Sequence, residues 1–86
     1  MPEISRFYGI IIKMFFRDHN PPHFHAEYGD DEALIDIRTL DILEGELPKR
    51  ARVLVSEWAL EHREELLENW SKARKPEELA SIKPLD

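Results

Sequence analysis

The chain has 86 residues, of which 42% are hydrophobic and 35% charged, and its formal net charge is −6 at pH 7. This length and composition favour one folded domain with a modest core over a disordered chain. An acidic chain is poorly suited to broad, sequence-independent binding of phosphate backbones, which depends on many Lys and Arg contacts. The lack of cysteine excludes disulfides and thiolate metal sites.

Targeting signals are not apparent in the sequence. The longest apolar run, 8–12, is far too short to cross a bilayer. The first residues, Met1, Pro2 and Glu3, lack the basic and then apolar pattern of a secretory signal peptide. We therefore expect a cytoplasmic protein with no membrane association.

Two strand-like segments are predicted near the start of the chain. Ser5–Tyr8 is followed by Gly9 as a turn residue, and 10–16 is rich in β-branched and aromatic side chains. We expect these two segments to form a hairpin. The following segment, 18–22, contains two consecutive prolines, which remove two backbone donors and exclude a helix or a central strand. It is predicted to be a stiff loop.

A second hairpin is predicted from 23–28 and 32–38, which alternate in polarity on either side of Gly29-Asp30-Asp31. A two-residue turn at Gly29-Asp30 makes one face of this ribbon wholly apolar, and that face must be the buried one. The side chains on it are Phe24, Ala26, Ala33 and Ile35.

The opposite face of the second hairpin carries polar groups. With the turn at Gly29-Asp30, His23 lies opposite Asp36, whereas a turn at Asp30-Asp31 places His25 opposite Asp36. In either register a histidine meets this carboxylate. Such a contact would fix the tautomer of the ring and raise the basicity of its other nitrogen.

The second half of the chain is predicted to be mainly helical. After a short strand at 39–44, one long helix is expected from Leu47, with Pro48 at its first position, to about Lys75. Its inward stripe has the three-and-four spacing of an amphipathic helix. The residues of that stripe are Ala51, Leu54, Val55, Trp58, His62, Leu66, Trp70 and Ala73.

These elements predict an α+β fold, a small antiparallel sheet of four to five strands packed against one long C-terminal helix. We expect a single domain over residues 1–86, with β hairpins in 1–46, the long helix in 47–75 and a tail in 76–86. A domain this small has a thin margin of stability, so a partner chain or a homodimer would add useful burial.

Three of the four histidines lie close together in the loop and the strand that follows it. These are His19, His23 and His25, and the last two share one face of a strand because strand side chains alternate. Imidazole is well matched to proton transfer at neutral pH and is also a common metal ligand. Ordinary histidines bonded to the backbone would explain the same pattern, so the sequence leaves three interpretations open.

The first chemical hypothesis is acid–base catalysis without a metal. Here Asp36 orients one histidine as a base and a second histidine acts as the conjugate acid, as cleavage of RNA would require. The proposed catalytic residues are His19, His23, His25 and Asp36. Cations that would stabilise a pentacoordinate phosphate are Lys13, Arg17 and Arg38.

The second chemical hypothesis is a metal site. His23 and His25 would be two ligands, and His19 or Asp18 would complete the set. Three nitrogen and oxygen ligands plus water describe a catalytic zinc or a similar divalent ion. The sequence carries no fixed ligand signature that would decide between this hypothesis and metal-free chemistry.

Several segments resemble one small bacterial family, the domain-of-unknown-function family 4160. They are the opening Met-Pro-Glu-Ile-Ser-Arg-Phe-Tyr-Gly-Ile, the segment Asp-His-Asn-Pro-Pro-His-Phe-His-Ala-Glu-Tyr-Gly at 18–29, Glu57-Trp58 and the Glu-Leu-Leu-Glu-Asn-Trp end of the helix. The resemblance covers nearly the whole chain, and the proline and histidine segment is its most specific mark.

The resemblance implies a compact bacterial protein, often encoded beside another small protein in pairs similar to toxin–antitoxin modules. It transfers no catalytic residues. The leading hypothesis is therefore a toxin–antitoxin component whose histidine cluster acts on RNA or another phosphate ester. The alternatives are a non-enzymatic module that binds a small protein encoded nearby, and a metal-binding protein that uses the same histidines.

Overall fold

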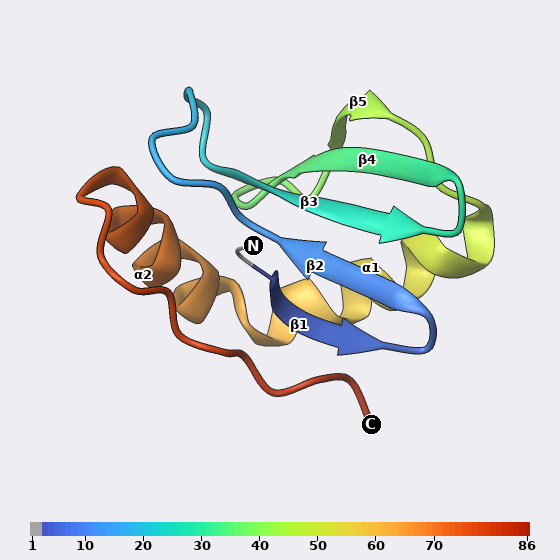
Figure 1. The fold of residues 1–86 in the computed structure, drawn as a ribbon. Helices are drawn as coiled ribbons and strands as arrows, with labels where there is room; N and C mark the ends of the chain where they lie inside the picture. Colours follow the sequence, from blue (N-terminus) through green and yellow to red (C-terminus); the bar gives the residue numbers. More distant parts are fainter. Residues whose placement is uncertain (1–2) are drawn as a thin grey trace.

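The computed structural model describes residues 3–86 as a five-stranded antiparallel sheet with two helices packed against one of its faces (Figure 1). The strands follow one another across the sheet in chain order, which confirms the expected α+β class. Among the described residues, neither helix is long and apolar enough to cross a membrane. The elements are β1 (Glu3–Phe7), β2 (Ile10–Lys13), β3 (His23–Tyr28), β4 (Asp31–Asp36), β5 (Ile42–Gly45), α1 (Lys49–Glu61) and α2 (Arg63–Arg74).

Both expected hairpins are present. β1 and β2 pair across a turn that contains Gly9, whose φ of 80° favours glycine. In the second hairpin Tyr28 pairs with Asp31, so the turn lies at Gly29-Asp30. The apolar face of that hairpin is buried as predicted, because the register places Phe24 opposite Ile35 and Ala26 opposite Ala33.

The segment between β4 and β5 differs from the expected continuous strands. Residues 37–41 form a turn in which the Asp36 carboxylate accepts the backbone N–H groups of Arg38 at 2.7 Å and Thr39 at 3.1 Å. The Leu40 N–H also donates to the Asp36 carbonyl at 2.8 Å. Local hydrogen bonds of this kind compete with strand pairing, so β4 ends at Asp36 and β5 begins only at Ile42.

The sequence predicts a single long helix. This prediction is wrong, because the chain forms two helices. The break is at His62, which has φ −117° and ψ 23°, and whose N–H is shared between the carbonyls of Trp58 and Ala59. The apolar stripe continues through the break, which is why periodicity alone does not reveal it. In Figure 1, α2 leaves the direction of α1 and reaches the loop between β2 and β3.

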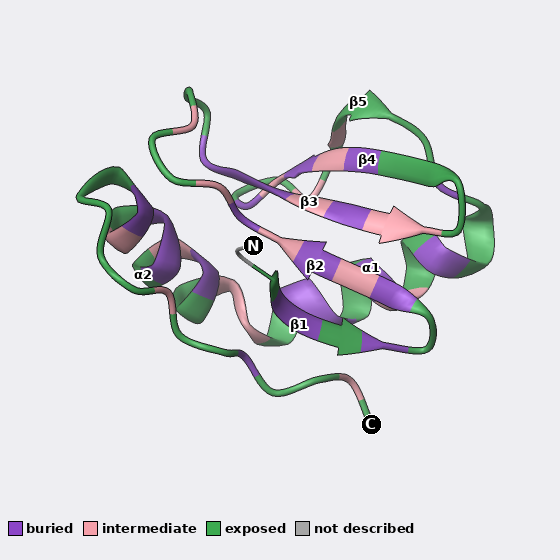
Figure 2. Cartoon of the chain, viewed as in Figure 1, coloured by how far each residue is buried: buried purple, intermediate pink, exposed green. Residues whose placement is uncertain are grey.

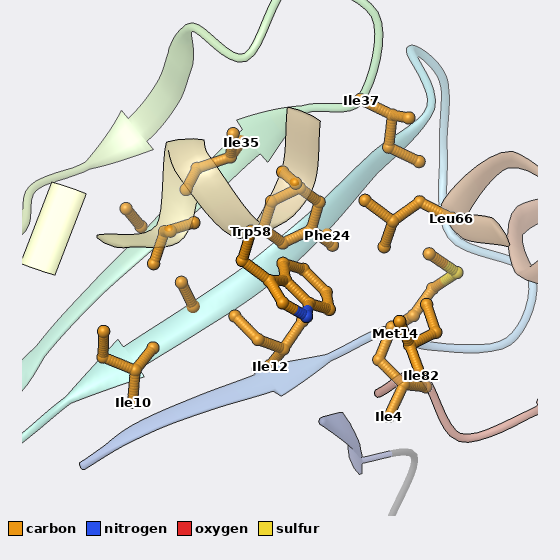
Figure 3. Packing of buried hydrophobic residues seen from close by; sticks show 14 of the residues in the cluster. Ile4, Ile10, Ile12, Met14, Phe24, Ile35, Ile37, Trp58, Leu66 and Ile82 are labelled. Atoms are coloured by element: carbon orange, nitrogen blue, oxygen red, sulfur yellow. The ribbon is translucent and has the colours of Figure 1, made fainter. Parts of the chain in front are cut away.

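Trp58 is at the centre of the core. Its indole ring lies 5.3 Å from Phe7 and 5.9 Å from Phe24, measured between ring centroids. Figure 3 shows it between Phe24, Ile12 and Leu66, which come from the sheet and from α2. In Figure 2 buried residues alternate with intermediate ones along β2 and recur along both helices, the pattern of a single packed layer between sheet and helices.

The tail, for which the sequence gives only weak signals, is fixed against the outer edge of β1. The Ile82 N–H donates to the Ile4 carbonyl at 2.8 Å, and the Ser5 hydroxyl donates to the Ile82 carbonyl at 3.0 Å. The Trp58 indole N–H donates to the Lys83 carbonyl at 2.9 Å. The tail therefore covers one edge of the sheet and closes the core.

Candidate metal centre

The candidate site is in the loop of residues 14–22, which connects β2 to β3 at one end of the sheet. The end of α2 holds this loop in place (Figure 1). The Arg17 N–H donates to the Ala73 carbonyl at 3.0 Å, and the Arg74 guanidinium donates to the Asn20 side-chain oxygen at 3.4 Å. The loop is thus anchored to a helix from the far end of the sequence.

Three side chains from this loop and from β3 converge on one point. His23 Nε2 lies 3.0 Å from Asp18 Oδ2, and His25 Nε2 lies 3.3 Å from the same oxygen. One donor atom from each of the three residues lies within 4.8 Å of the others. Asp18 comes from the loop, whereas both histidines lie at alternate positions of β3.

His23 is held rigidly. Its exposed fraction is 1%, and its ring packs 5.3 Å from that of Trp70 in α2. Its Nδ1 lies 2.8 Å from the Pro21 carbonyl. Because a carbonyl oxygen can only accept a hydrogen bond, this Nδ1 must carry the proton. The other nitrogen, Nε2, then faces Asp18.

His25 lies between two carboxylates. Its Nδ1 is 3.2 Å from Glu32 Oε2, and its Nε2 is the nitrogen that faces Asp18. Phe15 contacts the ring edge to face, with centroids 4.6 Å apart. The contacts on both ring nitrogens and the aromatic ring on the flank fix the orientation of this imidazole.

His19 contacts the other oxygen of the same carboxylate. Its Nδ1 lies 3.0 Å from Asp18 Oδ1, and its backbone N–H donates to that oxygen at 2.9 Å. Its side chain is 77% exposed, in contrast to His23 and His25. The His19 ring therefore lies at the solvent side of the cluster.

Several opposing effects act on the Asp18 carboxyl. Its partial burial disfavours the charged form and by itself would raise the pKa. The hydrogen bonds from His25, from the His19 backbone and from His23, together with the charge of His23, outweigh that burial. The pKa of Asp18 consequently lies below its ordinary value, and the carboxylate is ionised at neutral pH.

Two of the three separations within the donor set suit a divalent transition ion, and all three donor atoms lie within 4.8 Å of one another. Ligand atoms that bind zinc tetrahedrally, with bonds of about 2.0–2.2 Å, lie roughly 3.4 Å from one another. The distances of 3.0 and 3.3 Å from Asp18 Oδ2 to the two imidazole nitrogens are close to that separation. The Pro21 carbonyl and Glu32 supply the outer contacts that ligating histidines commonly have on their second nitrogen.

Comparison with known proteins places the whole cluster within one family. The model of a family described as a domain of unknown function, DUF4160, matches residues 9–71. The chain belongs to this family. Searches of curated proteins and of solved structures found no match. The matched region of the DUF4160 chain contains Asp18, His23, His25 and Glu32.

The DUF4160 chain uses a different carboxylate from the one expected beside the histidines. Asp36 does lie opposite His23 in the register, but its carboxylate is bonded within the turn after β4. Asp18 takes the expected place on His23. The alternation of the hairpin predicts that a histidine lies opposite Asp36, whereas nothing in the sequence predicts the loop path that brings Asp18 over β3.

The three cations expected to bind phosphate differ in their placement. Lys13 lies opposite His25 in the pairing of β2 with β3, and it forms an ion pair with Glu27 at 2.9 Å. Arg17 directly precedes Asp18 in the loop. Arg38 is exposed in the turn after β4.

Three groups at the cluster were missed by the sequence reasoning. Glu32 lies diagonally across the hairpin from His25, since Glu32 pairs with Glu27 and His25 with Leu34, so the predicted register could have identified it. The Pro21 carbonyl and Trp70 carried no such signal. Their contacts with His23 depend on the path of the loop and on the direction of α2.

A groove of about 460 Å³ lies elsewhere in the molecule, between β5 and the start of α1. It is lined by Ile35, Leu40, Asp41, Ile42, Lys49, Arg52, Val53 and Ser56. None of the cluster residues takes part in it. The candidate centre, formed by a loop and β3, is thus separate from this groove.

Proposed function

We propose that this protein binds one divalent transition-metal ion, such as zinc, through Asp18, His23 and His25. The observation that carries the proposal is the orientation of the two imidazoles. Both turn Nε2 toward the same Asp18 oxygen, while both Nδ1 atoms are engaged by acceptors, the Pro21 carbonyl and Glu32.

A proton count supports a metal ion at this point. If the Nδ1 atoms of His23 and His25 both carry protons, a neutral ring at either position directs a lone pair at the Asp18 carboxylate, which is repulsive. Without a metal, favourable contacts at both rings require two imidazolium ions next to one another. One divalent cation supplies the same charge, accepts both lone pairs and keeps both Nδ1–H bonds.

Three protein ligands leave coordination positions for water or a substrate, which is typical of catalytic and not of structural sites. Nitrogen and carboxylate donors of this kind suit zinc, and two histidines with one carboxylate also suit Fe(II). His19 lies close enough to Asp18 to remain a candidate additional ligand after rotation of its exposed ring.

The direct test is isothermal titration of untagged, chelator-treated protein with Zn²⁺ and Co²⁺. We expect one ion per chain for the wild type. His25→Ala and Asp18→Asn should weaken binding by more than the roughly 100-fold that loss of an outer contact can cause. His62→Ala is the matched control, because this fourth histidine is equally shielded but lies between the two helices.

Two results would contradict the proposal. One is a wild-type protein that binds neither ion. The other is a His62→Ala variant that loses as much affinity as His25→Ala, which would mean that binding depends on scattered surface histidines.

A second candidate function is metal-free acid–base catalysis on RNA or another phosphate ester, by a component of toxin–antitoxin type. The contact between His19 Nδ1 and Asp18 Oδ1 favours it, since a carboxylate on one nitrogen raises the basicity of the other, and this ring is exposed. The expected protein partner and homodimer stay predictions.

This second candidate is tested by growth of bacteria that express the wild type or the His23→Ala, His25→Ala double variant at matched levels. This candidate would be favoured over the metal centre if only the wild type stops growth and if elemental analysis finds no metal in the purified wild type. If cells that express either protein grow equally well, a toxin–antitoxin role would have to depend on binding of a protein partner.

A further inference from the structure

We propose that the open side of the Asp18, His23 and His25 centre binds phosphate esters, with Arg74 and Arg17 as the cations that hold the phosphate. This inference rests on the proposed metal centre and names its ligand class. The expected arrangement has one phosphate oxygen on the ion and another on a guanidinium group, which suits the planar fork of arginine.

Arg74 is placed beside the loop by a specific contact. As the last residue of α2, its guanidinium donates to Asn20, which follows His19 in the loop. Over residues 3–86, no carboxylate forms an ion pair with it, and the side chain is exposed. Its donors that do not face Asn20 are available to a ligand.

Arg17 is the second cation, and its backbone lies beside the end of α2. It directly precedes Asp18, and its left-handed backbone, with φ 57°, is fixed by the bond from its N–H to Ala73 next to Arg74. No carboxylate in the described part of the chain lies within ion-pair distance of its exposed guanidinium. Two arginines without an ion-pair partner in the described residues thus come from neighbouring backbone positions next to the loop that carries Asp18.

The helix dipole does not account for this arrangement. Basic residues suit the last turn of a helix, which explains Lys72 and Arg74 in part. The dipole does not explain the position of Arg17, which lies outside both helices, or the contact of Arg74 with Asn20. A divalent ion beside two arginines offers more positive charge than Asp18 and Glu32 neutralise, so an anion is the ligand that completes the site.

The experiment uses the full chain loaded with Co²⁺, whose visible absorption reports on its coordination. The probes are inorganic phosphate and dimethyl phosphate, with acetate as the comparison anion. We expect both phosphates to change the spectrum, and Arg74→Gln to weaken their binding about tenfold, as for loss of one charged hydrogen bond. Arg17→Gln should act similarly. Arg50→Gln, at the distant start of α1, is the matched control.

The outcomes separate this inference from the metal centre. A protein that binds Co²⁺ but gives no phosphate-dependent change, or in which Arg74→Gln and Arg17→Gln both behave like Arg50→Gln, overturns the phosphate site and leaves the metal site intact. Tighter binding of acetate than of either phosphate would overturn the ligand class. A wild type that binds no metal removes both.

Discussion

Two histidine environments in this protein look alike at first and differ in one respect. His25 and His62 have side chains that are both 14% exposed. Both rings also lie between two carboxylates: His25 between Glu32 and Asp18, and His62 between Glu65 at 2.6 Å and Glu61 at 3.9 Å. Burial and nearby negative charge therefore do not distinguish them.

The difference is convergence. Glu61 and Glu65 are close neighbours of His62 along the helices, and their side chains are largely exposed, at 66% and 50%. At the other environment, Asp18 comes from a loop and draws together two histidines of β3. A metal site needs ligands aimed at one point, and only the loop and strand provide that among the described residues.

The largest expected effect is the gain in stability on zinc binding, which should depend on the Asp18, His23 and His25 cluster and not on His62. With Zn²⁺ at about 100 times its Kd, the wild type should gain about 2.7 kcal/mol, which raises the Tm of so small a domain by roughly 10 °C or more. His23→Ala should lose this gain entirely, whereas His62→Ala should keep it. Differential scanning calorimetry with and without chelator measures both.

His23→Ala also removes a buried ring that packs on Trp70, so its metal-free form should be less stable by about 1–3 kcal/mol. The wild type with chelator provides the reference for that loss. A zinc-dependent rise of equal size in both histidine variants would show that the cluster has no special role.

An intermediate effect is expected at the carboxylates that contact Nδ1. Glu32→Gln should weaken Zn²⁺ binding about 10–100-fold, because Glu32 orients His25 and increases its basicity. Glu65→Gln makes the same chemical change at His62 and should leave Zn²⁺ affinity unchanged. The readout is competition with a chromophoric chelator, and equal effects of the two variants would contradict the assigned role of Glu32.

The smallest expected effect is on how the free energy of unfolding of the metal-free protein depends on pH. Because the pKa of folded Asp18 is below its ordinary value, ionised Asp18 stabilises the fold above the unfolded pKa of about 3.9, and this contribution is lost as the pH falls through the folded pKa. The stability difference between wild type and Asp18→Asn should therefore narrow as the pH falls below about 4.

Urea unfolding at several pH values, with chelator present, measures that difference. A gap that stays the same or widens as the pH falls below about 4 would mean that the histidine contacts do not stabilise the Asp18 carboxylate.

Alternation and composition alone determined most of the sheet. For the second hairpin, alternation predicts which face is buried and leaves two turn positions open, of which the structure has Gly29-Asp30. The same reasoning placed His23 and His25 on one face and marked the loop before them. These features are local in sequence, and each depends on side chains within a few residues of one another.

Only the tertiary structure decided which groups meet. The stripe through Trp58, His62 and Leu66 is equally compatible with one helix or two, and the break at His62 is what turns α2 toward the loop. That turn brings Trp70 onto His23 and Arg74 onto Asn20. The loop in turn places Asp18, and not Asp36, on the histidines. Contacts between residues so distant in sequence arise from packing of whole elements, which periodicity does not encode.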